Sequence, residues 1–134
     1  MLAPGSARTR LLSLFLQHGA DPNMLEERGQ PPIFSARENL DTERALLMHG
    51  ANIELRNLGG DTPLLHFVCN HCWQPALLLL DRGADIDVQN KASMTLDFAL
   101  QDVQESAVLL REALPSAYSR VRAVIERRRA AGTP

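Results

Sequence analysis

The chain has 134 residues, of which 45% are hydrophobic and 22% charged, and its formal net charge is −2. This is the composition of an ordinary water-soluble domain, and the slight negative charge argues against a chain built as a whole to bind nucleic acid. No apolar run approaches the ~20 residues that a membrane-spanning helix needs. Aromatic residues make up only 4% of the chain, so a core of Leu, Val, Ile and Ala in thin helical layers is favoured over a β-sandwich.

The cysteines and the N-terminal residues indicate a cytoplasmic location. The two cysteines, Cys69 and Cys72, are close together in the sequence and cannot form the disulfide framework of a small secreted domain. The N-terminal residues lack the basic and then apolar pattern of a signal peptide. We therefore expect a protein of the reducing cytosol.

The first predicted helix runs from about Ser6 to His18 and ends at Gly19. Four apolar residues at helical spacing define its buried face: Leu11, Leu12, Phe15 and Leu16. No other apolar helix precedes it, so this segment reads as half of a two-helix unit. Terminal units of repeat proteins are often atypical in this way.

The next two units each predict a pair of helices. In the second unit, a short helix within 29–36 is followed by one that Asp41 or Thr42 can cap and that ends at Gly50. In the third unit, Thr62 is a natural N-cap and Pro63 a natural first helical residue. The partner helix starts at Trp73 and ends before a glycine at 83.

The fourth unit is less regular. Its first helix is predicted at about 95–101 and its second at about 103–112, with Leu109 and Leu110 in the slot of a buried leucine pair. Ala113 stands where the other units have glycine, and Pro115 then interrupts the chain. A last helix, about 117–130, carries an apolar stripe that we expect to pack on the last repeat as a cap. The alternative is that this stripe binds a partner.

One phrase recurs through these units. The second helix of each of the first three units is followed by Gly-Ala, at Gly19, Gly50 and Gly83. The steps between these glycines are nearly equal. A period of roughly 30 residues is the signature of stacked repeats, in which each unit buries its apolar face against its neighbours. We therefore predict a single domain over 1–134. It divides into a half repeat at 6–20, repeats at about 21–51, 52–84 and 85–114, and a C-terminal helix at 116–130.

The repeating phrase resembles that of the ankyrin-repeat family. The run Gly60-Asp61-Thr62-Pro63-Leu64 is similar to the family's turn and Thr-Pro-Leu-His signature, although Leu65 stands where the family has His. Gly-Ala-Asp occurs at Gly19 and Gly83, with Asn52 in place of Asp in the middle copy. The resemblance implies an all-α ankyrin-repeat solenoid. It would have about three helix-turn-helix repeats, an N-terminal half repeat and a C-terminal capping helix.

The resemblance also implies a function. Proteins similar to this family bind other proteins on a concave face formed by the turn tips and the first helices. Carried over to this chain, the partner-binding residues would be Glu27, Arg28, Gln30, Arg56, Leu58, Asp61, Cys69, Asn70, Gln89, Lys91 and Ser93. We expect a non-catalytic, monomeric module that binds another protein without a cofactor. Replacing Arg56, Leu58 and Asp61 together is expected to abolish binding without lowering stability.

Two alternatives stay open. The chain could be a structural piece of a larger repeat assembly. It could also be a metal or redox protein, because the segment from His66 to Cys72 holds four metal-capable side chains, His66, Cys69, His71 and Cys72. Packing and capping account for the same residues, and buried cysteines are commonly small core residues, so no metal site is predicted.

For three further features we favour a structural role over catalysis or binding. Thr62 and His66 lack a third catalytic partner, so Thr62 is read as a helix cap. The arginines at 127–129 lack interleaved aromatics and read as a solvated helix end rather than a nucleic-acid site. Trp73 is expected to pack between units rather than to bind a partner.

Overall fold

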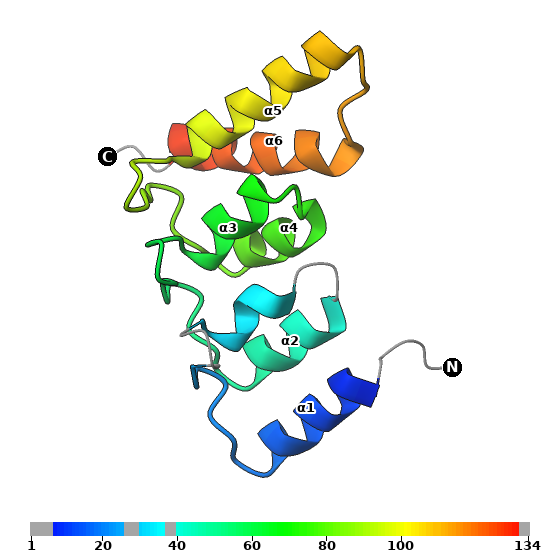
Figure 1. Cartoon of the computed structure of the whole chain (residues 1–134), viewed down its shortest axis with the longest axis vertical. Helices are drawn as coiled ribbons and strands as arrows, with labels where there is room; N and C mark the ends of the chain where they lie inside the picture. The colour runs from blue at the N-terminus through cyan, green and yellow to red at the C-terminus, as the bar shows by residue number, and fades with distance from the viewer. Residues whose placement is uncertain (1–6, 26–29, 37–39, 132–134) are drawn as a thin grey trace.

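The computed structural model describes residues 7–25, 30–36 and 40–131, and its elements are stacked helical layers (Figure 1). These elements are α1 (Ala7–Gln17), η1 (Pro32–Ala36), α2 (Leu40–Met48), α3 (Pro63–Cys69), α4 (Trp73–Asp81), α5 (Leu96–Leu110) and α6 (Ser116–Ala131). Within the described ranges, β-structure is limited to one isolated antiparallel bridge between Gln89 and Thr95. The fold is all-α, as predicted.

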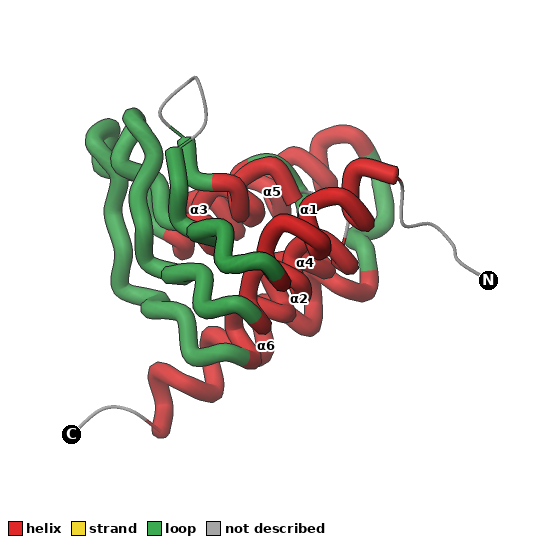
Figure 2. Tube along the Cα trace, turned by 90° about the horizontal axis from the view of Figure 1, so that it is seen from below, coloured by secondary structure: helices red, strands yellow, loops and turns green. Residues whose placement is uncertain are grey.

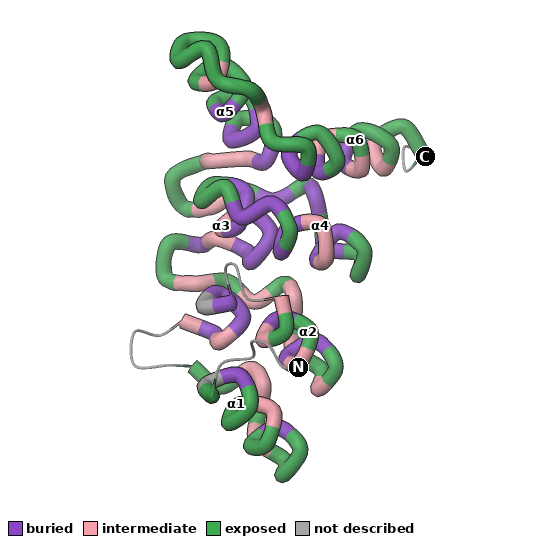
Figure 3. The backbone as a smooth tube through the Cα atoms, turned by 90° about the vertical axis from the view of Figure 1, so that its right-hand side faces the viewer, coloured by how far each residue is buried: buried purple, intermediate pink, exposed green. Residues whose placement is uncertain are grey.

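The helices form two rows. In one row, the 3-10 helix η1 packs on α3, and α3 packs on α5; in the other, α1, α2, α4 and α6 follow one another. The pairs η1 with α2 and α3 with α4 also pack across the rows. Figure 3 shows buried stretches, in purple, where these layers meet. Each layer therefore covers the apolar side of the next, as a stacked-repeat protein requires.

Local capping chemistry defines several helix ends. Thr62 Oγ1 accepts a hydrogen bond from Leu65 N at 3.3 Å and so caps α3. Thr95, at the equivalent position one repeat later, caps α5 through Phe98 N at 3.2 Å. Helix α4 is followed by Gly83, whose φ of +84° is one that residues with a Cβ rarely adopt.

The core is continuous and mostly aliphatic. Leu46 of α2 and Leu79 of α4 are both fully buried and occupy equivalent positions in successive layers. Trp73 is also buried and packs edge-on against Tyr118 of α6, with the ring centres 5.3 Å apart. The Tyr118 hydroxyl donates a 3.1 Å hydrogen bond to the carbonyl of Leu100. Trp73 therefore packs between units, as predicted.

The fourth unit differs from the prediction. The break expected near residue 102 is absent, because α5 is one helix of 15 residues that ends at a left-handed Arg111 with φ 58°. Helix α6 packs on α4 and so takes the position of the second helix of this unit. Leu109 and Leu110, expected in a buried pair, are 82% and 65% exposed on the far end of α5.

The C-terminal end face of the stack carries both polar and apolar residues. Asp97 and Gln101 stand one repeat after the buried Leu64 and Val68, and both are exposed. Phe98 of α5 is exposed as well. Arg129 of α6 forms an ion pair with Asp97, and an open groove of about 720 Å³ runs between α5 and α6. Polar residues on an outer face favour contact with water at the end of a repeat stack.

The N-terminal end face exposes apolar residues as well. Phe15 of α1 is 55% exposed, and Met24 and Leu25 of the following loop are each 60% exposed. Together with Leu12 and Leu16 they line a groove of about 660 Å³. Apolar side chains are therefore exposed at both described ends of the stack.

Candidate partner-binding surface

The loops that join successive layers form a row of fingers on one side of the helices (Figure 2). Two fingers, residues 52–61 and 85–95, are described in full. At the tip of the first, the Asn57 side chain accepts hydrogen bonds from Gly59 N and Asp61 N, both at 3.0 Å. At the tip of the second, Asn90 accepts in the same way from the residues two and four positions later, both at 2.9 Å. One asparagine per finger therefore satisfies the backbone of the turn.

The two fingers are also bonded to each other. Arg56 Nη1 donates to the carbonyl of Gly60 in its own finger and to the carbonyl of Gln89 in the next, both at 2.8 Å. Asn90 Nδ2 donates to Asp61 Oδ1 at 2.7 Å. These bonds join successive repeats outside the apolar core, so the fingers form one connected surface.

The contact between fingers requires glycine at position 60. Gly60 has a φ of +80°, and a Cβ placed on it would lie 2.9 Å from Lys91 N. The next backbone bond, from Lys91 N to Gly59 O, measures 3.0 Å. A side chain at position 60 would therefore strain the turn and push the second finger away.

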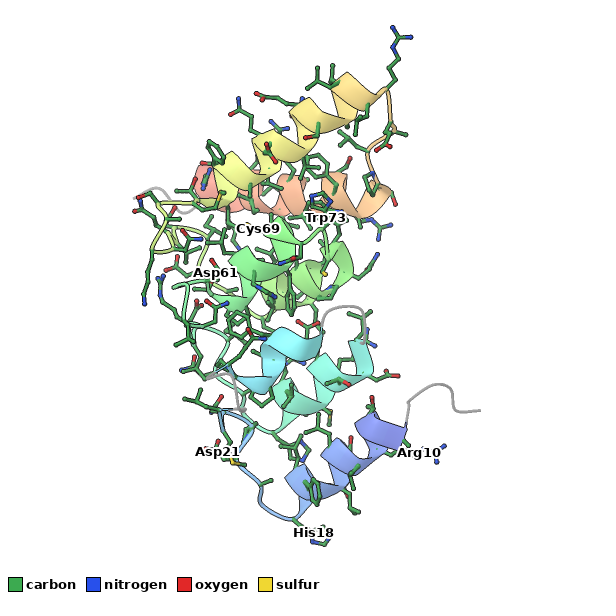
Figure 4. The ribbon with its side chains drawn as sticks, viewed as in Figure 1. Arg10, His18, Asp21, Asp61, Cys69 and Trp73 are labelled. Carbon is green, nitrogen blue, oxygen red and sulfur yellow. The ribbon has the colours of Figure 1, made fainter. Side chains whose placement is uncertain are left out.

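The predicted binding residues fall into four groups. Glu27 and Arg28 lie outside the described residues. Four residues are exposed at or beside the finger tips: Leu58, Gln89, Lys91 and Ser93. In the third group, Gln30 is half-buried before η1, and Cys69 (labelled in Figure 4) and Asn70 are exposed at the C-terminal end of α3.

Arg56 and Asp61 are the fourth group, and both have structural roles. Each makes side-chain hydrogen bonds that join the two fingers. Their replacement would remove these bonds, which typically contribute about 0.5–1.5 kcal/mol each. We therefore expect the combined Arg56, Leu58 and Asp61 variant to lose stability, contrary to the sequence-based expectation.

Sequence reasoning missed two features of this side of the molecule. The first is the pair Asn57 and Asn90, whose spacing matches the repeat period and could have revealed them. The second is Phe98 in the first turn of α5, which is 61% exposed. It stands one repeat after the fully buried Leu65, and only the end of the stack makes this position exposed.

The segment from His66 to Cys72 does not form a metal site in the described structure. His66 packs edge-on against Phe34, 5.1 Å between ring centres, whereas His71 stacks on Trp73. Cys69 is exposed and Cys72 is buried. Over the residues described, no group of three or more metal-capable side chains comes together.

The two cysteines also lack the features of a redox pair. Neither forms a disulfide in the described structure. Partial desolvation of the Cys69 thiol raises its pKa, and the carboxylates of Asp61 and Asp102 raise that pKa further. Reactive cysteines need a lowered pKa, because the thiolate is the nucleophile. The raised pKa of Cys69 therefore gives the redox alternative no support.

The arginines of α6 are used mainly within the fold. Arg128 donates to the carbonyls of Leu80 and Ala84, at the C-terminal end of α4. A cation is favourable there because unpaired helix carbonyls carry partial negative charge. Arg122 bonds Glu126 at 3.0 Å. Most of this basic cluster is thus engaged in packing and capping rather than displayed for nucleic acid.

Stacked helix pairs with interlocked fingers define a helical repeat protein, and comparison with known families gives the same class. The family model described as ankyrin repeats in three copies matches residues 1–90. The chain therefore belongs to the ankyrin-repeat family. Ankyrin repeats are generally protein–protein interaction modules, and the family is typically non-catalytic.

Three relatives illustrate the likeness. An ankyrin repeat protein of fowlpox virus (FPV034) is 37% identical over 57 residues, which are 42% of this chain and 14% of the viral protein. The mouse B-cell lymphoma 3 protein homolog is 37% identical over 83 residues, 58% of this chain and 18% of that protein. Ankyrin repeat protein B18 of variola virus is 32% identical over 76 residues, 53% of this chain and 13% of its own. The chain thus spans less than a fifth of the length of these relatives.

None of the described helices combines the length and the apolar character that crossing a membrane demands.

Proposed function

We propose that this chain is a non-catalytic module that binds a partner protein through its finger tips and the exposed end of α3. The proposal rests on one observation: within each finger, some side chains hold the backbone in place while others are exposed to solvent. Asn57, Arg56 and Asn90 hold the backbone in place, while Leu58 and Lys91 are exposed at the tips. A rigid loop with exposed side chains loses little conformational entropy on binding.

The chemistry of the tips suits a modest, specific protein interface. Leu58 is 71% exposed and would supply an apolar contact, and Gln89, Lys91 and Ser93 would supply polar ones. Interfaces of this kind combine a small apolar centre with a polar rim. We expect the chain to bind as a monomer in the cytoplasm, without a cofactor.

The proposal is tested with a matched pair of variants. Leu58→Ala with Lys91→Ala removes side chains at the tips, whereas Met48→Ala with Arg127→Ala removes an equally exposed apolar and basic pair from α2 and α6. Partner capture from host extract, quantified by mass spectrometry, should fall at least about tenfold for the tip variant, since interface hot spots cost about 2 kcal/mol or more, and stay unchanged for the control. Equal capture by both variants would overturn the placement.

A second candidate function, a structural piece of a larger repeat assembly, is favoured by the apolar N-terminal end face. The groove beside α1 is lined by Leu12, Phe15, Leu16, Met24 and Leu25 among others, and exposed apolar patches often mark interaction sites. Sedimentation velocity distinguishes the two candidates. A concentration-independent monomer favours the binding module, and self-association that Phe15→Asp abolishes favours the assembly.

A further inference from the structure

Helix α2 carries a carboxylic acid in the interior of the stack. Glu43, in the first turn of α2, has no exposed surface. Neither of its carboxyl oxygens has a hydrogen-bond partner within the described structure. A buried carboxyl group normally has such partners, so this one requires an explanation.

In the next repeat, the position equivalent to Glu43 holds an apolar residue. Ala76 stands at the equivalent place in α4 and is also fully buried. The following leucines, Leu46 in α2 and Leu79 in α4, are equivalent and fully buried as well. An ionised carboxylate without partners costs several kcal/mol in such a site, so the group is held in its neutral form.

Few of the described side chains around Glu43 are ionisable. Helix α2 packs against α1, η1 and α4. The described ionisable side chains of this part are Arg10 of α1 and His18 just after it, both exposed, and η1 contributes none. In α4, Asp81 is exposed. The cations that act on the carboxyl group are Arg44 of α2 and, next, Arg82 at the C-terminal end of α4, both of which are exposed.

The remaining ionisable groups of α2 point elsewhere. Asp41 is exposed and lies 3.9 Å from Arg44. His49, just after α2, has its Nδ1 atom 2.9 Å from the carbonyl of Ala45. Within the described surroundings, therefore, no group offers the Glu43 carboxylate a hydrogen bond.

We propose that Glu43 acts as a proton-sensitive latch for the N-terminal layers of the stack. In its neutral form it lets α2 pack against α1, η1 and α4. When it loses its proton, the charge must reach water or one of the two arginines, and the packing of α2 loosens. The pH of the surroundings therefore controls how firmly these layers hold.

The direction of the pH dependence follows from the burial of this group. Burial raises the pKa of Glu43 from its ordinary value of 4.5 to about 8, although Arg44 and then Arg82 oppose the rise. Below pH 4.5 the folded and unfolded chains both carry the proton, so the stabilising contribution is fully present. As the pH rises, the unfolded chain loses its proton first, and stability falls until the folded chain also ionises near pH 8.

The test compares urea unfolding of the wild-type chain with Glu43→Gln, Glu43→Ala and the control Glu112→Gln, which alters an exposed carboxylate on the surface. Between pH 5 and pH 8, the unfolding constant of the wild type should rise a few hundred-fold more than that of either Glu43 variant. Glu112→Gln should behave as the wild type. Parallel pH profiles for the wild type and both Glu43 variants would overturn the proposal.

A second measurement on the unmodified protein does not depend on the folding of any variant. Carbon-13 NMR of labelled glutamate side chains reports the titration of Glu43 directly, with the Glu43→Ala spectrum used only for assignment. A midpoint near pH 8, accompanied above that pH by a fall in the amide protection factors of α2 relative to those of α4, supports the latch. A midpoint in the ordinary range overturns it.

Discussion

Single polar residues, repeated at the period of the stack, build the rigid loops of this protein. Asn57 and Asn90 each accept two backbone hydrogen bonds at equivalent turn positions. Thr62 and Thr95 cap equivalent helices. Because these bonds satisfy the backbone locally, the neighbouring side chains at the finger tips are free to vary.

Alanine substitutions at Gly59 and Gly60 test the close approach of the two fingers. Gly60→Ala should destabilise the protein by about 1–3 kcal/mol, because it forces a side chain into a left-handed turn against the next finger. Gly59→Ala should cost less than about 1 kcal/mol, because the nearest atom to its Cβ would be Asn57 Oδ1 at 3.5 Å. Urea denaturation measures both. Equal losses would contradict the close approach of the fingers.

Part of the residue-scale description could be predicted from the sequence. The cap at Thr62 follows from local chemistry, since Ser, Thr, Asp and Asn precede helices for a known reason. The bond from Arg56 to the Gln89 carbonyl could not be predicted, because it depends on how two loops of successive repeats lie side by side. For the same reason, Arg56 was expected to be available for binding.

At the scale of elements, the last repeat shows how one missing break changes a layer. Asn70 ends α3, and His71 follows in a left-handed conformation with φ 61°. The equivalent residues in the fourth unit, 103–105, are Val-Gln-Glu, which continue a helix readily. Helix α5 therefore runs on to Leu110, and its exposed end (green in Figure 3) extends past the layer below.

Substitution of two leucines, one buried and one exposed, tests this difference between the repeats. Leu79→Ala should destabilise the protein by about 2–5 kcal/mol, because it leaves a cavity in a fully buried site between layers. Leu109→Ala should change stability by no more than about 0.5 kcal/mol, because this side chain is 82% exposed. Chemical denaturation followed by circular dichroism gives both values. A comparable loss for Leu109→Ala would mean that α5 packs differently from the structure described above.

At the scale of the whole molecule, both described ends of the stack expose apolar side chains. Phe98 and Leu109 of α5 are exposed at the C-terminal end, where Arg129 also forms an ion pair with Asp97. Phe15 and Met24 are exposed at the other end. In a stack, each layer is stabilised mainly by its neighbours. Among the described elements α1 packs mainly on α2, which carries the proposed latch at Glu43.

The sequence predicted the architecture better than the surface. The period of Gly19, Gly50 and Gly83 indicated the layers, because each glycine ends a helix that must stack on the next. The binding surface was harder to predict, because exposure depends on the position of a residue in the stack. Phe98 and Leu65 occupy the same place in their repeats, yet only Phe98 is exposed.

The most direct test of the proposed binding surface is a hydrogen-exchange footprint of the chain with its captured partner. Because the rigid fingers would form the contact, we expect amide protection at residues 57–59 and 89–93, with little change in α6. Protection confined to α2, α4 and α6, with the fingers exchanging as they do in the free protein, would contradict the account.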